Sequence, residues 1–180
     1  MSLIDEIIGR IIAQVVGRSA KRFEKATKDP RKTQEDKLLG IIRKNANTEY
    51  GKRYNFAAIH SIAEYQKQVP VVTYEDIRPY MDRVVEGESN ILTAEDPIGF
   101  AQTSGTTGNP KYIPITPTCK GREHRDVTQT WMCHSWAAHP HIMAGKSVSL
   151  VSPAVEGYTP SGMPYGSASG QIYRDMPPVV

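Results

Sequence analysis

A glycine- and hydroxyl-rich stretch between two apolar segments constrains the fold of this chain most. The apolar residues 97–102 precede the stretch, and the apolar, β-branched residues 111–116 follow it. Two short strands flanking a loop are predicted by this pattern. Gly105 and Gly108 permit a tight backbone curl, and converging backbone N–H groups can bind an anion there. Further donors near the loop are the hydroxyls of Thr103, Ser104, Thr106 and Thr107 and the ammonium of Lys111.

Two familiar nucleotide-binding patterns fail at this loop. The P-loop of nucleotide triphosphatases requires G-x-x-x-x-G-K-[ST], but Gly105 and Gly108 are three residues apart and no Gly-Lys pair follows. The dinucleotide fingerprint G-x-G-x-x-G fails because neither Thr103 nor Asn109 is glycine. Spacing alone therefore leaves a plain glycine-rich turn open as an alternative to a phosphate site.

The first part of the chain has a helical pattern. Apolar residues recur at helical spacing over residues 3–16, which predicts an amphipathic helix that reaches about Thr27. Such a helix packs on the body of a protein or lies on a membrane surface or a partner. A second helix is predicted over 33–46, and two capping pairs predict short helices at 62–68 and 79–87. The pairs are Ser61 with Glu64 and Thr73 with Asp76, and Pro79 is expected in the first turn of the later helix.

The second half mixes strand and helix patterns. Residues 90–93 and 97–102 have the pattern of short strands, 118–138 that of a helix, and 147–152 that of a buried strand. From residue 153 onward Gly, Pro and Ser dominate, which indicates a long functional loop or a region whose partner segments lie elsewhere. We expect an N-terminal helix and linker at 1–32 and an α/β domain at 33–180.

Composition excludes several classes of protein. Of 180 residues 39% are hydrophobic, so wholesale disorder is not expected. A net charge of +3 is too mild to predict nucleic-acid binding. Two cysteines fit a reducing compartment, and no apolar run approaches the ~18 residues of a membrane span. The sequence therefore predicts a cytoplasmic chain without a membrane span.

Metal and serine chemistry are also not expected. Zinc-type ligands gather at 133–141, but their spacing matches no ribbon or finger and no second ligand cluster exists. These ligands are Cys133, His134, His139 and His141. The Gly-x-Ser-x-Gly elbow of serine hydrolases fails at Ser104, because Gln102 stands two residues before it.

The loop resembles the phosphate-binding signature of adenylate-forming enzymes, since residues 100–111, FAQTSGTTGNPK, match that signature at every position. The surrounding segments NTEYGKRYNF, VPVVTYEDIRPYMDRVVEGESNILT and PSGMPYGSASG resemble the auxin-responsive promoter (Gretchen Hagen) family of acyl acid–amido synthetases. The likeness spans about residues 38–180, and the threonine-rich loop is more similar to a bacterial-type member.

This resemblance implies an α/β fold: the N-terminal part of the large domain of an adenylate-forming enzyme, with a helical N-terminal region followed by a mixed sheet with flanking helices. It implies ATP and Mg²⁺ as cofactors, with the magnesium ligands largely outside this chain. Lys111 would be the catalytic charged contact. The residues that would contact the triphosphate are Thr103, Ser104, Gly105, Thr106, Thr107 and Gly108.

The resemblance also implies two further partners, a carboxylic acid that becomes an acyl-adenylate and an amine, such as an amino acid, that accepts it. Tyr158, Met163 and Tyr165 would line the acyl pocket, although the segment around them, residues 156–170, also suits a surface loop. An acyl-coenzyme A ligase and a non-catalytic nucleotide- or acid-binding homologue are the alternative functions. We expect the chain to be the N-terminal piece of a longer protein and to form no amide by itself.

Overall fold

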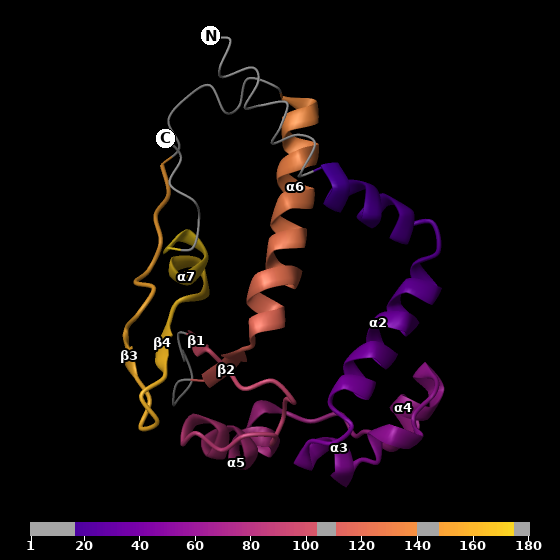
Figure 1. Cartoon of the computed structure of the whole chain (residues 1–180), viewed down its shortest axis with the longest axis vertical. Helices are drawn as coiled ribbons and strands as arrows, with labels where there is room; N and C mark the ends of the chain where they lie inside the picture. Colours follow the sequence, from indigo (N-terminus) through magenta and orange to yellow (C-terminus); the bar gives the residue numbers. More distant parts are fainter. Residues whose placement is uncertain (1–16, 104–110, 140–147, 175–180) are drawn as a thin grey trace. The chain divides into compact units, whose positions relative to one another are not determined.

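The computed structural model describes residues 17–103, 111–139 and 148–174 (Figure 1). The chain divides into two compact units. The first unit comprises Met1–Gln34 with Thr118–Ser149, and the second comprises Glu35–Pro117 with Leu150–Val180. Residues 1–16, which hold the predicted apolar stripe, lie outside the described residues.

In the first unit two helical segments pack together. Residues 17–26 are helical, and a π-helical segment, η2 (Cys119–His124), leads into α6 (Arg125–Ala138), which confirms the helix predicted at 118–138. Ser19 is buried and its hydroxyl donates to Gln129 Oε1 at 3.2 Å. Arg22 donates to Asp126 Oδ2 at 3.1 Å. Polar side chains therefore join the two helical segments.

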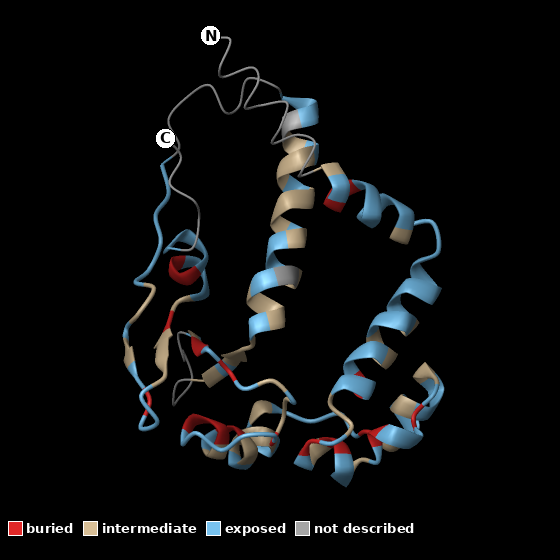
Figure 2. Cartoon of the chain, viewed as in Figure 1, coloured by how far each residue is buried: buried red, intermediate tan, exposed pale blue. Residues whose placement is uncertain are grey.

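The second unit opens with short helices. The order is α2 (Pro30–Lys44), whose first residues belong to the other unit, then α3 (Glu49–Arg53), η1 (Phe56–Ala58), α4 (Ile62–Gln68) and α5 (Tyr74–Val85). Ile42, Phe56, Ile59 and Val69 form one buried cluster between these elements. Figure 2 shows α2 as mostly exposed, and Ile42 is its buried residue.

Both predicted capping pairs are confirmed. The Ser61 hydroxyl accepts a hydrogen bond from the Glu64 N–H at 3.2 Å. The Asp76 carboxylate accepts from the Thr73 N–H at 2.7 Å. The helix expected at 79–87 was placed wrongly, because α5 begins directly after Thr73 and holds Pro79 in its interior. The capping box sets the start of α5, and Pro79 removes only one N–H from a helix that tertiary packing supports.

A mixed four-stranded sheet follows the helices. Its strands are β1 (Gly99–Thr103), β2 (Lys111–Ile115), β3 (Gly157–Tyr158) and β4 (Pro164–Gly166), in the order β2-β1-β4-β3. β1 pairs antiparallel with β2 and parallel with β4, and β3 pairs antiparallel with β4. The strands predicted on both sides of the loop are confirmed, and so is the α/β class with a helical N-terminal region and a mixed sheet.

The second buried cluster joins α5 to this sheet. It contains Phe100 of β1, which is 0% exposed, together with Met81, Val84, Val85 and Ile91. The turn between β3 and β4 also contacts α5, because the Ser161 hydroxyl donates to the Val85 carbonyl at 2.8 Å. Helix and sheet thus share one core around Phe100.

Two strand predictions are wrong. Residues 90–93 form no strand; Asn90 is left-handed at φ 60°, and the carbonyls of Asn90 and Ile91 accept from the first N–H groups of α3 at 3.0 Å each. Those N–H groups have no partner inside their own helix, which explains the arrangement. Residues 148–152 also form no strand, and Leu150 is 99% exposed rather than buried.

The Gly-, Pro- and Ser-rich region after residue 153 is more ordered than a long loop. It contains β3, β4 and the short helix α7 (Ala168–Arg174).

In the described ranges no helix combines the length and the apolar character that a membrane crossing needs.

Two glycines test this packing as a matched pair. A Cβ at buried Gly51 would lie 2.1 Å from the Asn45 carbonyl oxygen, whereas at Gly40 in α2 nothing lies within 4 Å. We expect Gly51→Ala to lower the free energy of unfolding by about 2 kcal/mol or more, because backbone atoms must move. Gly40→Ala should raise it by about 0.5–1 kcal/mol. Urea unfolding followed by circular dichroism measures both, and equal effects would contradict the packing at Gly51.

Candidate functional site

The ends of the glycine-rich loop are held side by side by strand pairing. Thr103 is the last residue of β1, Lys111 is the first of β2, and the two are directly paired in the antiparallel register. Opposite residues in such a pair have α-carbons about 4.5–5.5 Å apart. Thr103 is exposed and Lys111 is half-buried. The intervening predicted residues, Ser104, Gly105, Thr106, Thr107 and Gly108, lie outside the described residues.

β1 is fixed from within the core. Phe100 and Ala101 are buried, and the Phe100 ring meets the Tyr112 ring edge-on, with centroids 5.9 Å apart. The Phe100 carbonyl accepts a buried hydrogen bond of 3.0 Å from Nε2 of Gln171 in α7. The strand that leads into the loop is therefore held by its two neighbouring strands and by a side chain from α7.

β2 is an edge strand of this sheet. At Tyr112, a residue of α5 makes the backbone hydrogen bonds that an outer neighbouring strand would make. The Tyr74 hydroxyl accepts from the Tyr112 N–H at 2.9 Å and donates to the Tyr112 carbonyl at 3.2 Å. Unpaired backbone groups on a sheet edge invite pairing with another chain. One tyrosine hydroxyl thus satisfies both outward groups of Tyr112, next to Lys111.

The Lys111 side chain lies over the ring of Tyr74, which Arg78 also contacts. Its Nζ lies 5.5 Å from the centroid of the Tyr74 ring, and Cζ of Arg78 lies 4.9 Å from the same centroid. Arg78 also forms a two-point ion pair with Glu75, at 2.6 and 2.8 Å. The hydrogen bond from Arg78, with a weaker contribution from the charge of Lys111, holds the pKa of Glu75 below its ordinary value.

Sequence reasoning did not find Tyr74, Glu75 and Arg78 as neighbours of Lys111. The capping pair Thr73 and Asp76 was the available signal, because it places Tyr74 at the start of a helix. Nothing in the local pattern says that this helix start lies beside β2, since that contact joins residues far apart in the chain.

The three residues predicted for the acyl pocket separate into two environments. Met163 and Tyr165 pack against the cluster around Phe100, and the Tyr165 ring lies 5.3 Å from the Tyr112 ring. Burial, with a smaller contribution from Tyr165, raises the pKa of the Tyr112 phenol. Tyr158 in β3 is 67% exposed. The structure thus brings Met163 and Tyr165 to the strand pair, and the acyl-pocket role of all three stays a prediction.

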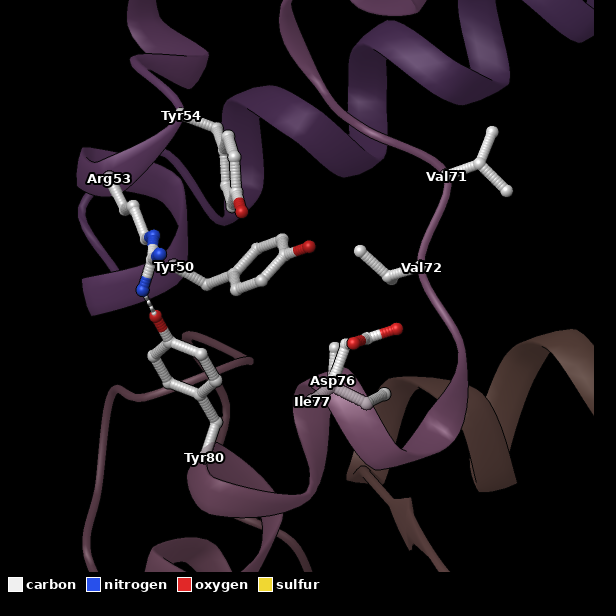
Figure 3. A pocket seen from close by; sticks show the side chains of 8 residues that line it. All are labelled: Tyr50, Arg53, Tyr54, Val71, Val72, Asp76, Ile77 and Tyr80. Carbon is white, nitrogen blue, oxygen red and sulfur yellow. Dashed lines mark hydrogen bonds between the residues drawn. The ribbon is translucent and has the colours of Figure 1, made fainter.

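A tyrosine-rich hollow of ≈ 350 Å³ lies between α3, α5 and the extended segment before α5 (Figure 3). The Arg53 guanidinium donates to the Tyr80 hydroxyl and lies 5.7 and 5.9 Å from the ring centroids of Tyr54 and Tyr80. Tyr50 projects between these two rings. The hollow was not predicted, and its own arginine contacts its aromatic faces.

No group of three or more His, Cys, Asp or Glu side chains gathers as a metal site in the part of the chain that the structure describes. The zinc-type ligands at 133–141, for which the sequence predicts no metal site, include His141, which lies outside the described residues. Cys133 and His134 lie on α6, and His134 Nε2 is 3.9 Å from Glu24 Oε1.

Comparisons with known proteins agree on one family. The family model described as "GH3 family N-terminal domain" matches residues 19–179. The indole-3-acetic acid-amido synthetase GH3.2 of Arabidopsis thaliana is 35% identical over 160 residues, which cover 87% of this chain and 29% of that protein. The jasmonoyl–L-amino acid synthetase JAR4 of Nicotiana attenuata is 28% identical over 157 residues, covering 86% and 27%.

A solved structure has the same fold. The GH3.15 acyl acid amido synthetase superposes with a TM-score of 0.73 at 27% sequence identity, over 87% of this chain and 28% of that chain. The chain therefore spans less than a third of the length of each of these relatives.

The buried bond from α7 to β1 gives a test of how the loop is anchored. Gln171→Leu would leave the Phe100 carbonyl without its side-chain donor, so we expect the free energy of unfolding to fall by about 1–3 kcal/mol. Tyr173→Leu, at a 54% exposed position of the same helix, is the control and should change it by less than about 0.5 kcal/mol. Urea unfolding compares the two, and equal losses would argue against the anchoring bond.

Proposed function

The chain belongs to the GH3 (Gretchen Hagen) family, and on this premise we propose that it forms the N-terminal part of an ATP-dependent acyl acid–amido synthetase. The observation that carries the proposal is the pairing of Thr103 with Lys111. These two residues are the first and last of the segment TSGTTGNPK, which resembles the phosphate-binding signature, so the pairing holds its ends together. Relatives over most of the chain bear the names of amido synthetases, which supports the same function.

In this proposal the hairpin loop binds the triphosphate of ATP. Thr103, Ser104, Gly105, Thr106, Thr107 and Gly108 offer hydroxyl and backbone N–H donors. Lys111 adds a positive charge at the loop's end, on a strand whose backbone is hydrogen-bonded on its outer edge at Tyr112. Donors that are fixed before the reaction stabilise charge as it develops, without a reorganisation cost at that moment.

The proposed first step forms an acyl-adenylate. A carboxylate oxygen of the acid attacks the α-phosphorus of ATP, a new O–P bond forms, and the bond from that phosphorus to the bridging oxygen breaks. Pyrophosphate leaves with the electron pair, so negative charge grows where Lys111 and the loop donors are proposed to lie. No protein nucleophile is needed, because the substrate carboxylate itself attacks.

The proposed second step forms an amide. The nitrogen of an amine attacks the acyl carbon, the bond from that carbon to the adenylate oxygen breaks, and AMP leaves while the nitrogen loses a proton. An amino acid is the proposed acceptor and a small carboxylic acid the proposed donor, because the relatives are named for jasmonoyl–amino acid and indole-3-acetic acid-amido synthesis. Met163 and Tyr165, with Tyr158, are the proposed lining of the acid's pocket.

Magnesium enters the proposal only with the nucleotide. Mg²⁺ is held by phosphate oxygens in many ATP sites and keeps several waters. The described residues gather no metal-ligand group, and the proposed magnesium ligands lie largely outside this chain. A cytoplasmic location, the domain boundary at residue 32 and the bacterial-type character stay predictions of the sequence.

Two alternatives share the loop. An acyl-coenzyme A ligase would pass the same adenylate to a thiol, but the relatives' names favour an amine acceptor. A non-catalytic homologue would bind nucleotide without releasing pyrophosphate.

The experiment that tests the function uses the protein that carries this chain at its N-terminus. Acid-dependent exchange of labelled pyrophosphate into ATP, across a panel of aryl and alkyl carboxylic acids, detects the adenylate. Mass spectrometry then identifies the product with amino acids and with coenzyme A offered together. We expect exchange with at least one acid and an amide as product. Absence of exchange across the panel would favour a binding protein, and a thioester would favour the ligase.

The same assay tests Lys111. We expect Lys111→Ala to slow pyrophosphate exchange by about 100-fold, as loss of one preorganised charge-stabilising group does in other enzymes. Lys67→Ala, at an exposed position of α4, removes an equal charge away from the loop and should leave the rate unchanged. An unchanged rate in Lys111→Ala, with normal exchange in the parent protein, would remove Lys111 from the mechanism.

A further inference from the structure

Building on the proposed function, we propose that Tyr74 is a positioning residue for Lys111, with its hydroxyl fixing the backbone of β2 and its ring fixing the place of the ammonium. Tyr74 opens α5 and lies far in sequence from the loop that it serves. No contact between Tyr74 and a substrate is required. Its effect on the reaction would pass through Lys111 alone.

The Tyr74 hydroxyl holds the backbone of β2 next to Lys111. It makes two hydrogen bonds to the residue that follows Lys111, at 2.9 Å from the Tyr112 N–H and at 3.2 Å to the Tyr112 carbonyl. Both backbone groups of Tyr112 on the open edge of the sheet are thus tied to a helix. Because Lys111 is the first residue of β2, a fixed Tyr112 limits where the Lys111 backbone can go.

The Tyr74 ring contacts the Lys111 ammonium. The Lys111 Nζ lies 5.5 Å from the Tyr74 ring centroid, within the roughly 6 Å range of a cation–π contact. Arg78 lies against the same ring at 4.9 Å, and its charge is balanced by the paired Glu75 carboxylate. Lys111 and Arg78 therefore share one aromatic ring, with one carboxylate beside them. The Tyr74 ring gives the Lys111 ammonium a defined resting place.

The start of α5 holds Tyr74 itself. The Asp76 carboxylate accepts from the Thr73 N–H and from the Thr73 hydroxyl, at 2.7 Å each. These two bonds lower the pKa of Asp76, so it is charged at neutral pH and stays a strong acceptor. The Tyr74 side chain also packs against the buried cluster around Phe100. The ring that receives Lys111 is thus fixed to both the helix start and the core.

A lysine held in this way has less freedom to lose when the triphosphate arrives. Lysine carries about 2 kcal/mol of rotamer entropy, and catalytic groups work best when their supporting neighbours limit that freedom in advance. Loss of Tyr74 should therefore weaken what Lys111 contributes to pyrophosphate release while leaving the acid's pocket intact.

Three variants of the protein that carries this chain separate the effect of the Tyr74 hydroxyl from the effect of the Tyr74 ring. Tyr74→Phe keeps the ring and removes both hydrogen bonds, whereas Tyr74→Leu removes the ring as well. Tyr80→Phe is the matched control. It deletes a tyrosine hydroxyl from the same helix, but that hydroxyl accepts a hydrogen bond from Arg53 and makes none with β2. Pyrophosphate exchange gives kcat/KM for ATP and KM for the acid, and melting by circular dichroism checks folding.

We expect kcat/KM for ATP to fall about 3–10-fold in Tyr74→Phe, as for the loss of net hydrogen bonds. It should fall about a further 3-fold in Tyr74→Leu, as for the loss of a cation–π contact. KM for the acid should not change, and Tyr80→Phe should resemble the parent protein.

In a Lys111→Ala background Tyr74→Phe should have no further effect on the rate, because the residue it positions is gone. An equal fall in both backgrounds, or no fall in either, would overturn the inference while the proposed function stands. If Tyr74→Leu fails to fold, Tyr74→Phe alone decides.

A second measurement does not depend on adenylation. Acetylation of Lys111 by a water-soluble active ester, followed by peptide mass spectrometry, reports how freely the amine meets solvent. We expect Lys111 to react about 2–5-fold faster in Tyr74→Leu than in the parent protein, as for release from a cation–π contact, with Lys67 as the internal reference. Unchanged labelling would overturn the positioning role. If the parent protein shows no pyrophosphate exchange, the proposed function fails, and this labelling still decides whether Tyr74 holds Lys111.

Discussion

The antiparallel pairing of β1 with β2 is the constraint on which the second unit depends, because it joins the buried core at one end to the glycine-rich loop at the other. Phe100 contributes its side chain to the core shared with α5, and its carbonyl receives the side chain of Gln171 from α7. The same strand ends at Thr103, opposite Lys111. Packing at Phe100 therefore fixes the ends of the loop, which lie only a few residues away, and groups held on strands are positioned more precisely than groups on loops.

Of the helices before the sheet, α5 contacts this strand pair. Its capping box sets Tyr74 at the first helical position, its apolar face packs on Phe100, and the Tyr74 hydroxyl completes the edge strand at Tyr112. At Tyr112 the helix therefore makes the backbone hydrogen bonds that another strand would otherwise make. This solution leaves a ring and a charged pair, Arg78 with Glu75, beside Lys111, so the element that protects the sheet edge also shapes the surroundings of the proposed catalytic lysine.

Under the proposed function these features of a GH3-family chain would serve one site. The chain covers less than a third of the relatives that it resembles, and the segment it covers holds the proposed triphosphate end of an adenylate-forming site. The family supports an amide-forming reaction, while the arrangement of Tyr74, Lys111 and Tyr112 is what the structure adds. The proposed acid pocket rests on Met163 and Tyr165, which pack near the same strand pair, more than on exposed Tyr158.

The sequence by itself determined the local features of this protein: the two capping pairs, the strands on both sides of the loop, the helix after them and the family signature of residues 100–111. Each depends on residues close together in the chain, where spacing and side-chain chemistry act directly. Only the tertiary structure decided that Asn90 and Ile91 bond to the N-terminus of α3 instead of belonging to a strand, that α5 runs through Pro79, and that Tyr74 meets β2. Those outcomes depend on which distant backbone groups find partners and which apolar faces are buried together, and local patterns carry no information about either.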